Sequence, residues 1–146
     1  MAERTSSKIA IAADPAAIMA VIADLEAYPE WAGSVKEVEV VSVYDDASER
    51  PAEARFVVDA GPVKDTYTLE YSWDADREVR WTLTEASILT AMDGAYRLTP
   101  GADSNTEVEY ELVLELRIPM IGLLRRKAEK AIIDIALKEL KKRVEG

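Results

Sequence analysis

The chain has 146 residues, 49% hydrophobic and 32% charged, as expected for one globular domain over residues 1–146 at ~150 residues per domain. Its 18 Lys and Arg against 28 Asp and Glu give a net charge of −10, which argues against nucleic-acid binding, because phosphate contacts need a basic surface. The lack of Cys and His excludes thiol nucleophiles, disulfides, Ser-His-Asp triads and ordinary zinc sites. The spacing of the carboxylates predicts no metal site, and the sequence predicts no other cofactor. We therefore expect a binding function more than a catalytic one.

The N-terminal third begins with a strand and a helical pair. Alternating apolar residues predict a strand over residues 6–12. Asp14 and Pro15 then favour a helix start, since Asp is a common N-cap and Pro suits the first helical position. This helix must end before Pro29, because a proline biases the preceding residue away from helix. Residues 28–33 predict a bend and a second short helix.

From Val35 onward the pattern alternates, as in strands with one buried face. Turns are predicted at residues 45–51, 61–62, 74–77 and 100–101. The residues predicted to point inward include Val38, Val40, Tyr44, Phe56, Val58, Tyr67, Leu69, Tyr71, Trp73, Val79, Trp81, Leu83, Met92, Gly94, Tyr96, Leu98, Val108, Tyr110, Leu112, Leu114 and Leu116. We expect antiparallel neighbours with one apolar and one acidic, solvated face, although periodicity alone leaves a flat two-layer sandwich open.

The C-terminal segment is predicted to be one long helix. After Pro119 it runs to about Val144, ~35 Å at 1.5 Å per residue. The last strand, residues 108–118, spans a similar ~37 Å at 3.4 Å per residue, so the helix could lie along the whole apolar face. Its apolar residues form two stripes that we expect to face different parts of the sheet: Leu124, Ala128, Ile132 and Ile135, then Ile133, Leu137, Leu140 and Val144.

The order of these elements resembles the START-like (Bet v 1-like, SRPBCC) superfamily, and within it the bacterial polyketide cyclase/dehydrase-like group. The residues that carry the resemblance are Ile9-Ala10-Ile11 with Asp14-Pro15, Tyr28-Pro29-Glu30-Trp31, Tyr67-Thr68-Leu69-Glu70-Tyr71, Gly94-Ala95-Tyr96-Arg97-Leu98 and Pro119-Met120. The resemblance covers nearly the whole chain. It implies an α+β helix-grip fold: a curved antiparallel sheet of about six to seven strands wraps around a long C-terminal helix, two short helices follow the first strand, and an apolar cavity lies between sheet and helix.

Members of this superfamily bind or carry lipids, sterols, quinones and polyketides, and some are polyketide aromatase/cyclases. The resemblance therefore implies that this protein binds a hydrophobic small molecule, which is lipid, quinone, sterol-like or polyketide-like, in the cavity between the sheet and the C-terminal helix. Two alternatives stay open. One is a polyketide aromatase/cyclase or dehydratase that uses the same cavity, although the sequence identifies no catalytic residue. The other is a protein-interaction module without a ligand.

Sixteen residues are candidates to line this cavity: Trp31, Phe56, Val58, Tyr67, Leu69, Tyr71, Trp81, Leu83, Met92, Tyr96, Leu112, Leu114, Met120, Leu124, Ala128 and Ile132. Each aromatic residue taken singly is more simply explained as core. Three inward tyrosines are harder to explain in that way, because a buried hydroxyl needs a hydrogen-bond partner. Tyr67, Tyr71 and Tyr96 are therefore the best candidates for ligand contact, and Lys127 is expected at the cavity mouth.

Arginines bear on the cyclase alternative. In polyketide aromatase/cyclases the family pattern brings a buried Arg to the substrate carbonyls. Arg55, Arg80 and Arg97 flank inward aromatic residues and so take the outward positions. The pattern therefore predicts no strand arginine in the cavity, a conclusion that a β-bulge would reverse.

The sequence also bears on location and partners. The first residues lack a signal-peptide pattern, and no stretch approaches the ~20 apolar residues of a membrane span, so a cytoplasmic location is expected. Residues 125–146 hold eight Lys and Arg against four Asp and Glu, whereas residues 1–124 hold ten against twenty-four. A basic amphipathic helix can contact a membrane transiently. We favour the alternative that these Lys and Arg residues lie on the exposed side of the helix and complement the acidic sheet and the helix dipole. Nothing in the sequence predicts an oligomeric state.

Overall fold

The computed structural model describes residues 4–60, 63–117 and 122–146. Its elements in chain order are β1 (Thr5–Ile11), α1 (Pro15–Ala23), the 3-10 helix η1 (Leu25–Glu30), β2 (Val35–Val43), β3 (Pro51–Ala60), β4 (Val63–Asp74), β5 (Glu78–Ala86), β6 (Leu89–Pro100), β7 (Thr106–Leu116) and α2 (Gly122–Glu145). The predictions made for Gly61, Pro62, Pro119 and Met120 lie outside the described residues.

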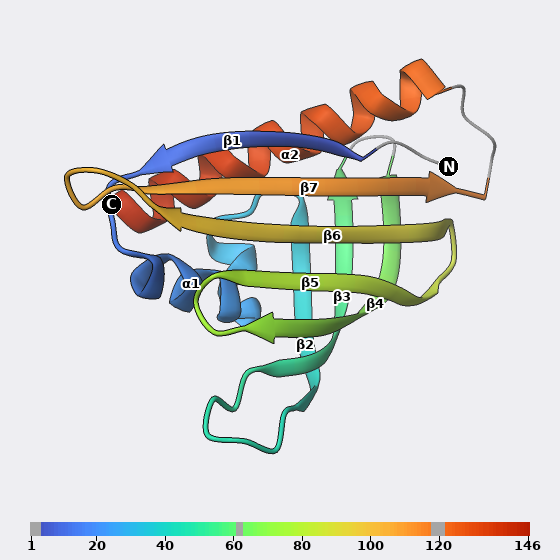
Figure 1. Cartoon of the computed structure of the whole chain (residues 1–146). Coiled ribbons are helices and arrows are strands. Elements are labelled where there is room, and N and C mark those ends of the chain that lie inside the picture. Colours follow the sequence, from blue (N-terminus) through green and yellow to red (C-terminus); the bar gives the residue numbers. More distant parts are fainter. Residues whose placement is uncertain (1–3, 61–62, 118–121) are drawn as a thin grey trace.

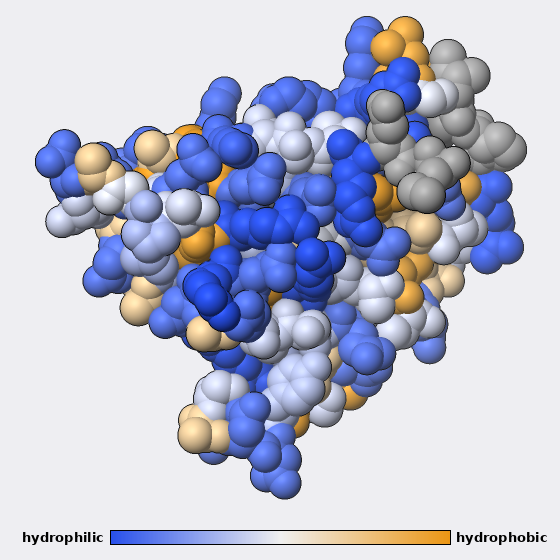
Figure 2. Space-filling view, in the orientation of Figure 1, coloured by the Kyte–Doolittle hydropathy of each residue, from blue (hydrophilic) through white to orange (hydrophobic). Residues whose placement is uncertain are grey.

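The seven strands form one antiparallel sheet in the order β1-β7-β6-β5-β4-β3-β2. Strands β2 to β7 follow one another as a meander, and β1 pairs with β7, with Ile9 opposite Val108. The sheet curves strongly, so that β2 and β3 cross behind β5 to β7 in Figure 1. Its outer face, turned toward the viewer, is largely hydrophilic (Figure 2). The predicted helix-grip α+β fold is confirmed, and the flat two-layer sandwich is excluded.

The helical pair after β1 starts as predicted. Asp14 is the N-cap of α1, and its Oδ1 accepts a hydrogen bond of 2.8 Å from the backbone N–H of Ala17. Pro15 occupies the first helical position, where it has no intrahelical N–H bond to lose. The second short helix, η1, begins at Leu25, earlier than predicted, and the Leu25 side chain is buried.

Helix α2 contacts β1, β7 and α1, so it lies along one side of the sheet and not over its whole apolar face (Figure 1). Its second predicted stripe is the buried one, with Ile133, Leu137 and Leu140 at most 2% exposed. The first stripe is only partly covered, and Ile135 is 55% exposed. A space therefore remains between α2 and the curved strands β3 to β6.

Candidate ligand cavity

A cavity of about 260 Å³ lies between the concave face of the sheet, η1 and α2. Twelve of the residues proposed from the sequence line it: Trp31, Phe56, Val58, Tyr67, Leu69, Tyr71, Trp81, Met92, Tyr96, Leu114, Ala128 and Ile132. Strand residues dominate this set because alternation places every second side chain of β3 to β7 on the concave face.

Three proposed residues lie away from the cavity, and each has a local reason. Leu83 lies at a register step, where the pairing passes from Thr68 opposite Glu85 to Leu69 opposite Leu83, and it is half-buried. Leu112 is fully buried in the core. Leu124 is 53% exposed, because it precedes the buried Ile133 by nine residues, about two and a half turns at 3.6 residues per turn, and so lies on the opposite side of the helix.

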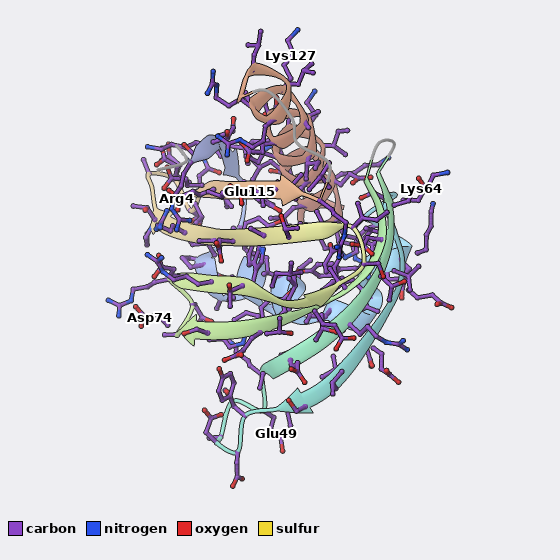
Figure 3. The ribbon with its side chains drawn as sticks, turned by 90° about the vertical axis from the view of Figure 1, so that its right-hand side faces the viewer. Arg4, Glu49, Lys64, Asp74, Glu115 and Lys127 are labelled. Carbon is purple, nitrogen blue, oxygen red and sulfur yellow. The ribbon has the colours of Figure 1, made fainter. Side chains whose placement is uncertain are left out.

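Two further residues, Met120 and Lys127, were also predicted to lie at the cavity. Met120 lies outside the described residues. Lys127, expected at the cavity mouth, is exposed and points away from the sheet at the outer end of α2 (Figure 3). Lys127 is thus not among the described residues that line the cavity.

Sequence reasoning missed several residues of the cavity wall, of which Tyr28, Tyr110 and Glu139 matter most chemically. Tyr110 has the same strand parity as Leu114, so alternation placed it inward without marking it as lining. Glu139 continues the stripe Ala128, Ile132 and Ile135 at spacings of four, three and four, which is a signal that a purely apolar search passes over.

Four tyrosine hydroxyls face the cavity. Among the described residues, none forms a hydrogen bond with the hydroxyls of Tyr67, Tyr71, Tyr96 or Tyr110, and none of these oxygens is fully buried in protein. Tyr28 differs, since its hydroxyl donates a hydrogen bond of 2.5 Å to the carbonyl oxygen of Ile22. The four hydroxyls are thus available as donors and acceptors inside an otherwise apolar wall.

Burial raises the pKa of each of the five tyrosines that line the cavity above the ordinary tyrosine value; they are Tyr28, Tyr67, Tyr71, Tyr96 and Tyr110. After burial, the neighbouring hydroxyls contribute to the shift: Tyr67 and Tyr110 raise the pKa of Tyr71, and Tyr110 raises the pKa of Tyr96. The hydroxyls therefore stay protonated at neutral pH, where they can donate hydrogen bonds but do not act as bases.

The aromatic rings form a continuous wall. Phe56 and Tyr67 stack with ring centroids 5.6 Å apart. Farther along, the Trp81 ring lies 5.5 Å from that of Tyr96, and Tyr96 meets Tyr110 edge to face at 4.6 Å. Such contacts hold the rings in place and present both apolar faces and polar edges to the cavity.

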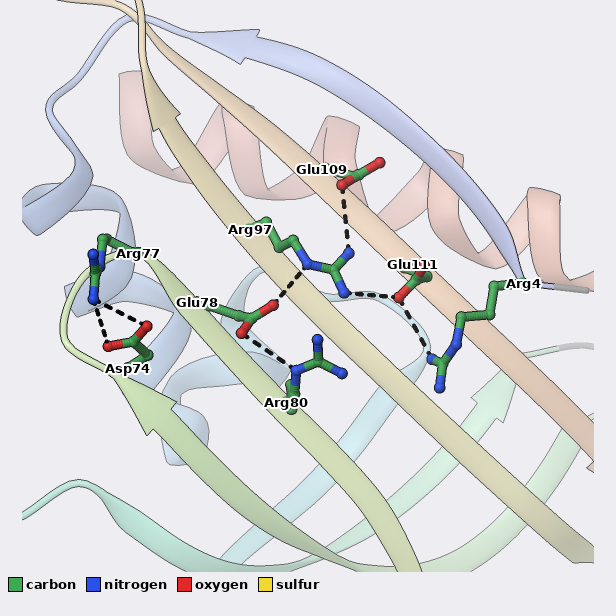
Figure 4. Close-up of polar contacts among 8 residues, drawn as sticks. All are labelled: Arg4, Asp74, Arg77, Glu78, Arg80, Arg97, Glu109 and Glu111. Carbon is green, nitrogen blue, oxygen red and sulfur yellow. Dashed lines mark hydrogen bonds and ion pairs between the residues drawn. The ribbon is translucent and has the colours of Figure 1, made fainter.

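The strand arginines lie on the opposite, outer face, as predicted. Arg97 pairs with Glu78 at 2.7 Å, Glu111 at 3.1 Å and Glu109 at 3.4 Å (Figure 4). Arg80 also pairs with Glu78, at 3.3 Å. Within the described part of the chain, no Lys or Arg lines the cavity. The buried arginine of the aromatase/cyclase pattern has no counterpart on these strands.

The basic residues of α2 are partly neutralised within the protein. Four of them form ion pairs with carboxylates: Arg125 with Glu115, Lys130 with Asp134, Lys141 with Glu145 and Arg143 with Glu30. These ion pairs agree with the prediction that the basic residues of α2 complement acidic groups of the protein itself. Contact with a membrane stays a prediction. Among the described residues, no helix is long and apolar enough to cross a membrane. In the same residues, no group of three or more Asp or Glu could hold a metal ion.

The family is shown by a model that matches residues 11–141, described as polyketide cyclase / dehydrase and lipid transport. The chain belongs to this family. A search of curated proteins found no match.

Several proteins of known structure share the fold of this chain. A START superfamily protein from Mycobacterium smegmatis has a TM-score of 0.90 at 22% identity, with 97% of each chain covered. A protein from Thermus thermophilus has a TM-score of 0.78 at 26% identity, again with 97% of each chain covered. The Zhui aromatase/cyclase from Streptomyces sp. R1128 has a TM-score of 0.78 at 17% identity, over 98% of this chain and 93% of that one.

Proposed function

We propose that this protein binds a hydrophobic small molecule in the cavity between the sheet and α2 and shields it from water. The observation that carries the proposal is the set of four tyrosine hydroxyls without a protein partner among the described residues, placed in an aromatic wall. Apolar burial at ~25 cal/mol per Å² would supply most of the affinity, and the hydroxyls would orient the ligand. The family, whose description includes lipid transport, supports this function.

The size of the cavity limits the ligand. Its volume of about 260 Å³ exceeds the ~150 Å³ of an engineered cavity that accepts benzene, and it falls near the lower end of the ~300–1,000 Å³ of ligand pockets. A compact molecule of one to a few rings fits such a space better than a lipid with two acyl chains. Quinone-like and polyketide-like ligands are therefore favoured within the proposed class.

The second candidate is a polyketide aromatase/cyclase or dehydratase reaction in the same cavity. The fold shared with the Zhui aromatase/cyclase favours it. The cavity would then hold a poly-β-keto chain in a folded conformation, and a tyrosine or bound water would move protons. The outward strand arginines weigh against it. A protein-interaction role without a ligand, and a cytoplasmic location, stay predictions.

The first experiment is native mass spectrometry of the freshly purified protein, followed by solvent extraction and identification of any released molecule. We expect one lipophilic molecule per chain. Because a weak ligand can be lost in purification, the same protein is then titrated with 2-naphthol as a probe. An empty protein that also fails to bind 2-naphthol contradicts the proposal.

Tyrosine substitutions separate binding from catalysis. For a carrier, Tyr67→Phe and Tyr71→Phe should weaken ligand binding by no more than about tenfold, since one hydrogen bond contributes ~1 kcal/mol. For an enzyme, the same variants should lose rate at nearly unchanged binding. Lys127→Ala, at an exposed position away from the cavity, is the matched control and should change neither property.

A further inference from the structure

Glu139 introduces a carboxylate into the cavity wall. Its side chain is half-buried, and apart from the tyrosines it is the only ionisable group that lines the cavity within the described residues. Every other described lining residue is aromatic, aliphatic, alanine, methionine or serine. The cavity therefore carries one negative charge, and no positive charge from the described residues.

The Glu139 carboxylate is held in place by the backbone. Its Oε2 accepts a hydrogen bond of 3.1 Å from the N–H of Gly33, which links α2 to the segment before β2. A Cβ at residue 33 would lie 3.3 Å from the same oxygen, so the backbone of this segment and the Glu139 side chain approach each other closely. The second oxygen, Oε1, keeps its capacity to accept hydrogen bonds.

No described cation pairs with Glu139. Arg143, four residues further along α2, is directed to Glu30 instead, at 3.2 Å. The carboxylate also acts on the cavity interior: after burial and Tyr110 and Tyr28, its charge contributes to raising the pKa of Tyr96. The charge of Glu139 thus acts on the hydroxyl of Tyr96, which faces the same cavity.

We propose that Glu139 sets the ligand class, by accepting a hydrogen bond from a donor group on the ligand and by excluding ligands that carry a carboxylate. This inference rests on the proposed function and adds to it a selection by charge. Within the proposed class, this rule favours polyketide-like ligands that carry a hydroxyl group over quinones, whose carbonyl oxygens only accept hydrogen bonds. A compact hydrophobic molecule with an ammonium group also fits, and free fatty acids and other organic anions are disfavoured. The physical reason is that two like charges repel at short range, and within the described residues no lysine or arginine lines the wall to offset them.

Three probes with the same ring system test this selection by charge, which we call the charge rule: a ligand with a donor group binds, and one with a carboxylate is disfavoured. The probes are 2-naphthol, 2-(aminomethyl)naphthalene and 2-naphthoate, titrated at pH 7 by calorimetry. We expect the wild-type protein to bind 2-naphthol at least tenfold more tightly than 2-naphthoate. The aminomethyl compound distinguishes a hydroxyl from an ammonium donor, and it too should bind more tightly than 2-naphthoate. A wild-type protein that binds 2-naphthoate as well as 2-naphthol overturns the proposal without any variant.

The variant Glu139→Gln removes the charge and keeps an oxygen that can accept the Gly33 hydrogen bond. It should strengthen 2-naphthoate binding and reduce the naphthol-to-naphthoate ratio to threefold or less. Glu70→Gln removes one negative charge at an exposed position of β4 and should leave the wild-type ratio unchanged. An unchanged ratio in Glu139→Gln contradicts the role of Glu139.

Failure of the proposed function would look different. Ala136→Trp and Ala128→Phe place larger side chains at two lining positions of α2 and should abolish binding of 2-naphthol. Circular dichroism checks that each variant is folded. If 2-naphthol binds equally well to both folded variants, the cavity is not the binding site and the proposed function fails. If they lose binding while the charge rule fails, only the role of Glu139 is overturned.

Discussion

Trp81 and Gly94 lie opposite each other on β5 and β6, and the indole ring of Trp81 occupies the space that a side chain at residue 94 would need. A Cβ at Gly94 would lie 2.6 Å from the indole Nε1 and closer still to two ring carbons. Because residue 94 has no side chain, the large ring can lie against β6, where it lines the cavity and packs against Tyr96 and Tyr110.

Gly94→Ala should therefore destabilise the protein by about 1–3 kcal/mol, because the buried indole ring has to move from its position. Urea unfolding followed by tryptophan fluorescence measures the loss. Gly122→Ala is the control: among the described residues its Cβ would meet only the flexible end of the Arg126 side chain, so it should change stability little. Equal stability of the wild type and Gly94→Ala would mean that the ring moves without cost.

Glu129 joins α2 to two strands from a fully buried position. Its carboxylate accepts hydrogen bonds of 2.5 Å from the Thr5 hydroxyl and 2.7 Å from the Leu114 N–H. Glu129→Ala would leave the Leu114 N–H without this acceptor and create a void, so we expect a loss of about 2–4 kcal/mol in chemical denaturation. Glu129→Gln can still accept from Leu114 and donate to Thr5, and it should recover most of the loss. Equal losses in both variants would show that the hydrogen bonds contribute little.

Asp65 should make stability depend on acid pH. Burial alone would raise the pKa of this carboxyl, but hydrogen bonds from the N–H groups of Leu89, Ile88, Ser87 and Thr66 outweigh burial and hold the pKa below its ordinary value. The resulting stabilisation is present above the unfolded-state pKa of ~3.9 and is lost as the pH falls through the lower folded-state pKa.

Asp65→Asn tests this acid dependence, since an amide offers one oxygen where the carboxylate offers two. The variant should be less stable than the wild type at pH 7 by about 1–3 kcal/mol, and the difference should shrink as the pH falls below ~4. Urea unfolding at a series of pH values measures it. A difference that is the same at pH 7 and pH 3 would contradict the account.

The five buried tyrosines should make the protein sensitive to alkali. Because burial raises the pKa of each, the folded state keeps protons that the unfolded state releases above pH ~10, so stability falls as the pH rises from ~10 toward the folded-state values. Each tyrosine contributes up to ~1.4 kcal/mol per pH unit, and five together up to ~7. Absorbance at alkaline pH should show these tyrosines ionising together with unfolding. Ionisation near pH 10 in a protein that remains folded would contradict the prediction.

Local patterns in the sequence predicted most of the fold and much of the cavity wall. Asp14 and Pro15 marked the start of α1, because capping depends on a few adjacent residues. Alternation placed Tyr67, Tyr71 and Tyr96 on the concave face, because strand side chains alternate whatever the strand pairs with.

The contribution of α2 followed from tertiary packing. The sequence showed two apolar stripes on this helix, but contacts with β1 and β7 selected the one with Ile133 as the buried stripe and left Leu124 exposed. The same placement turned Glu139 toward the cavity, where Gly33 from a distant segment holds it. The 3.6-residue period alone determines which residues share a face of the helix. The direction in which that face points depends on packing against other segments, among them β1 and the segment at Gly33, which lie more than a hundred residues away in the sequence.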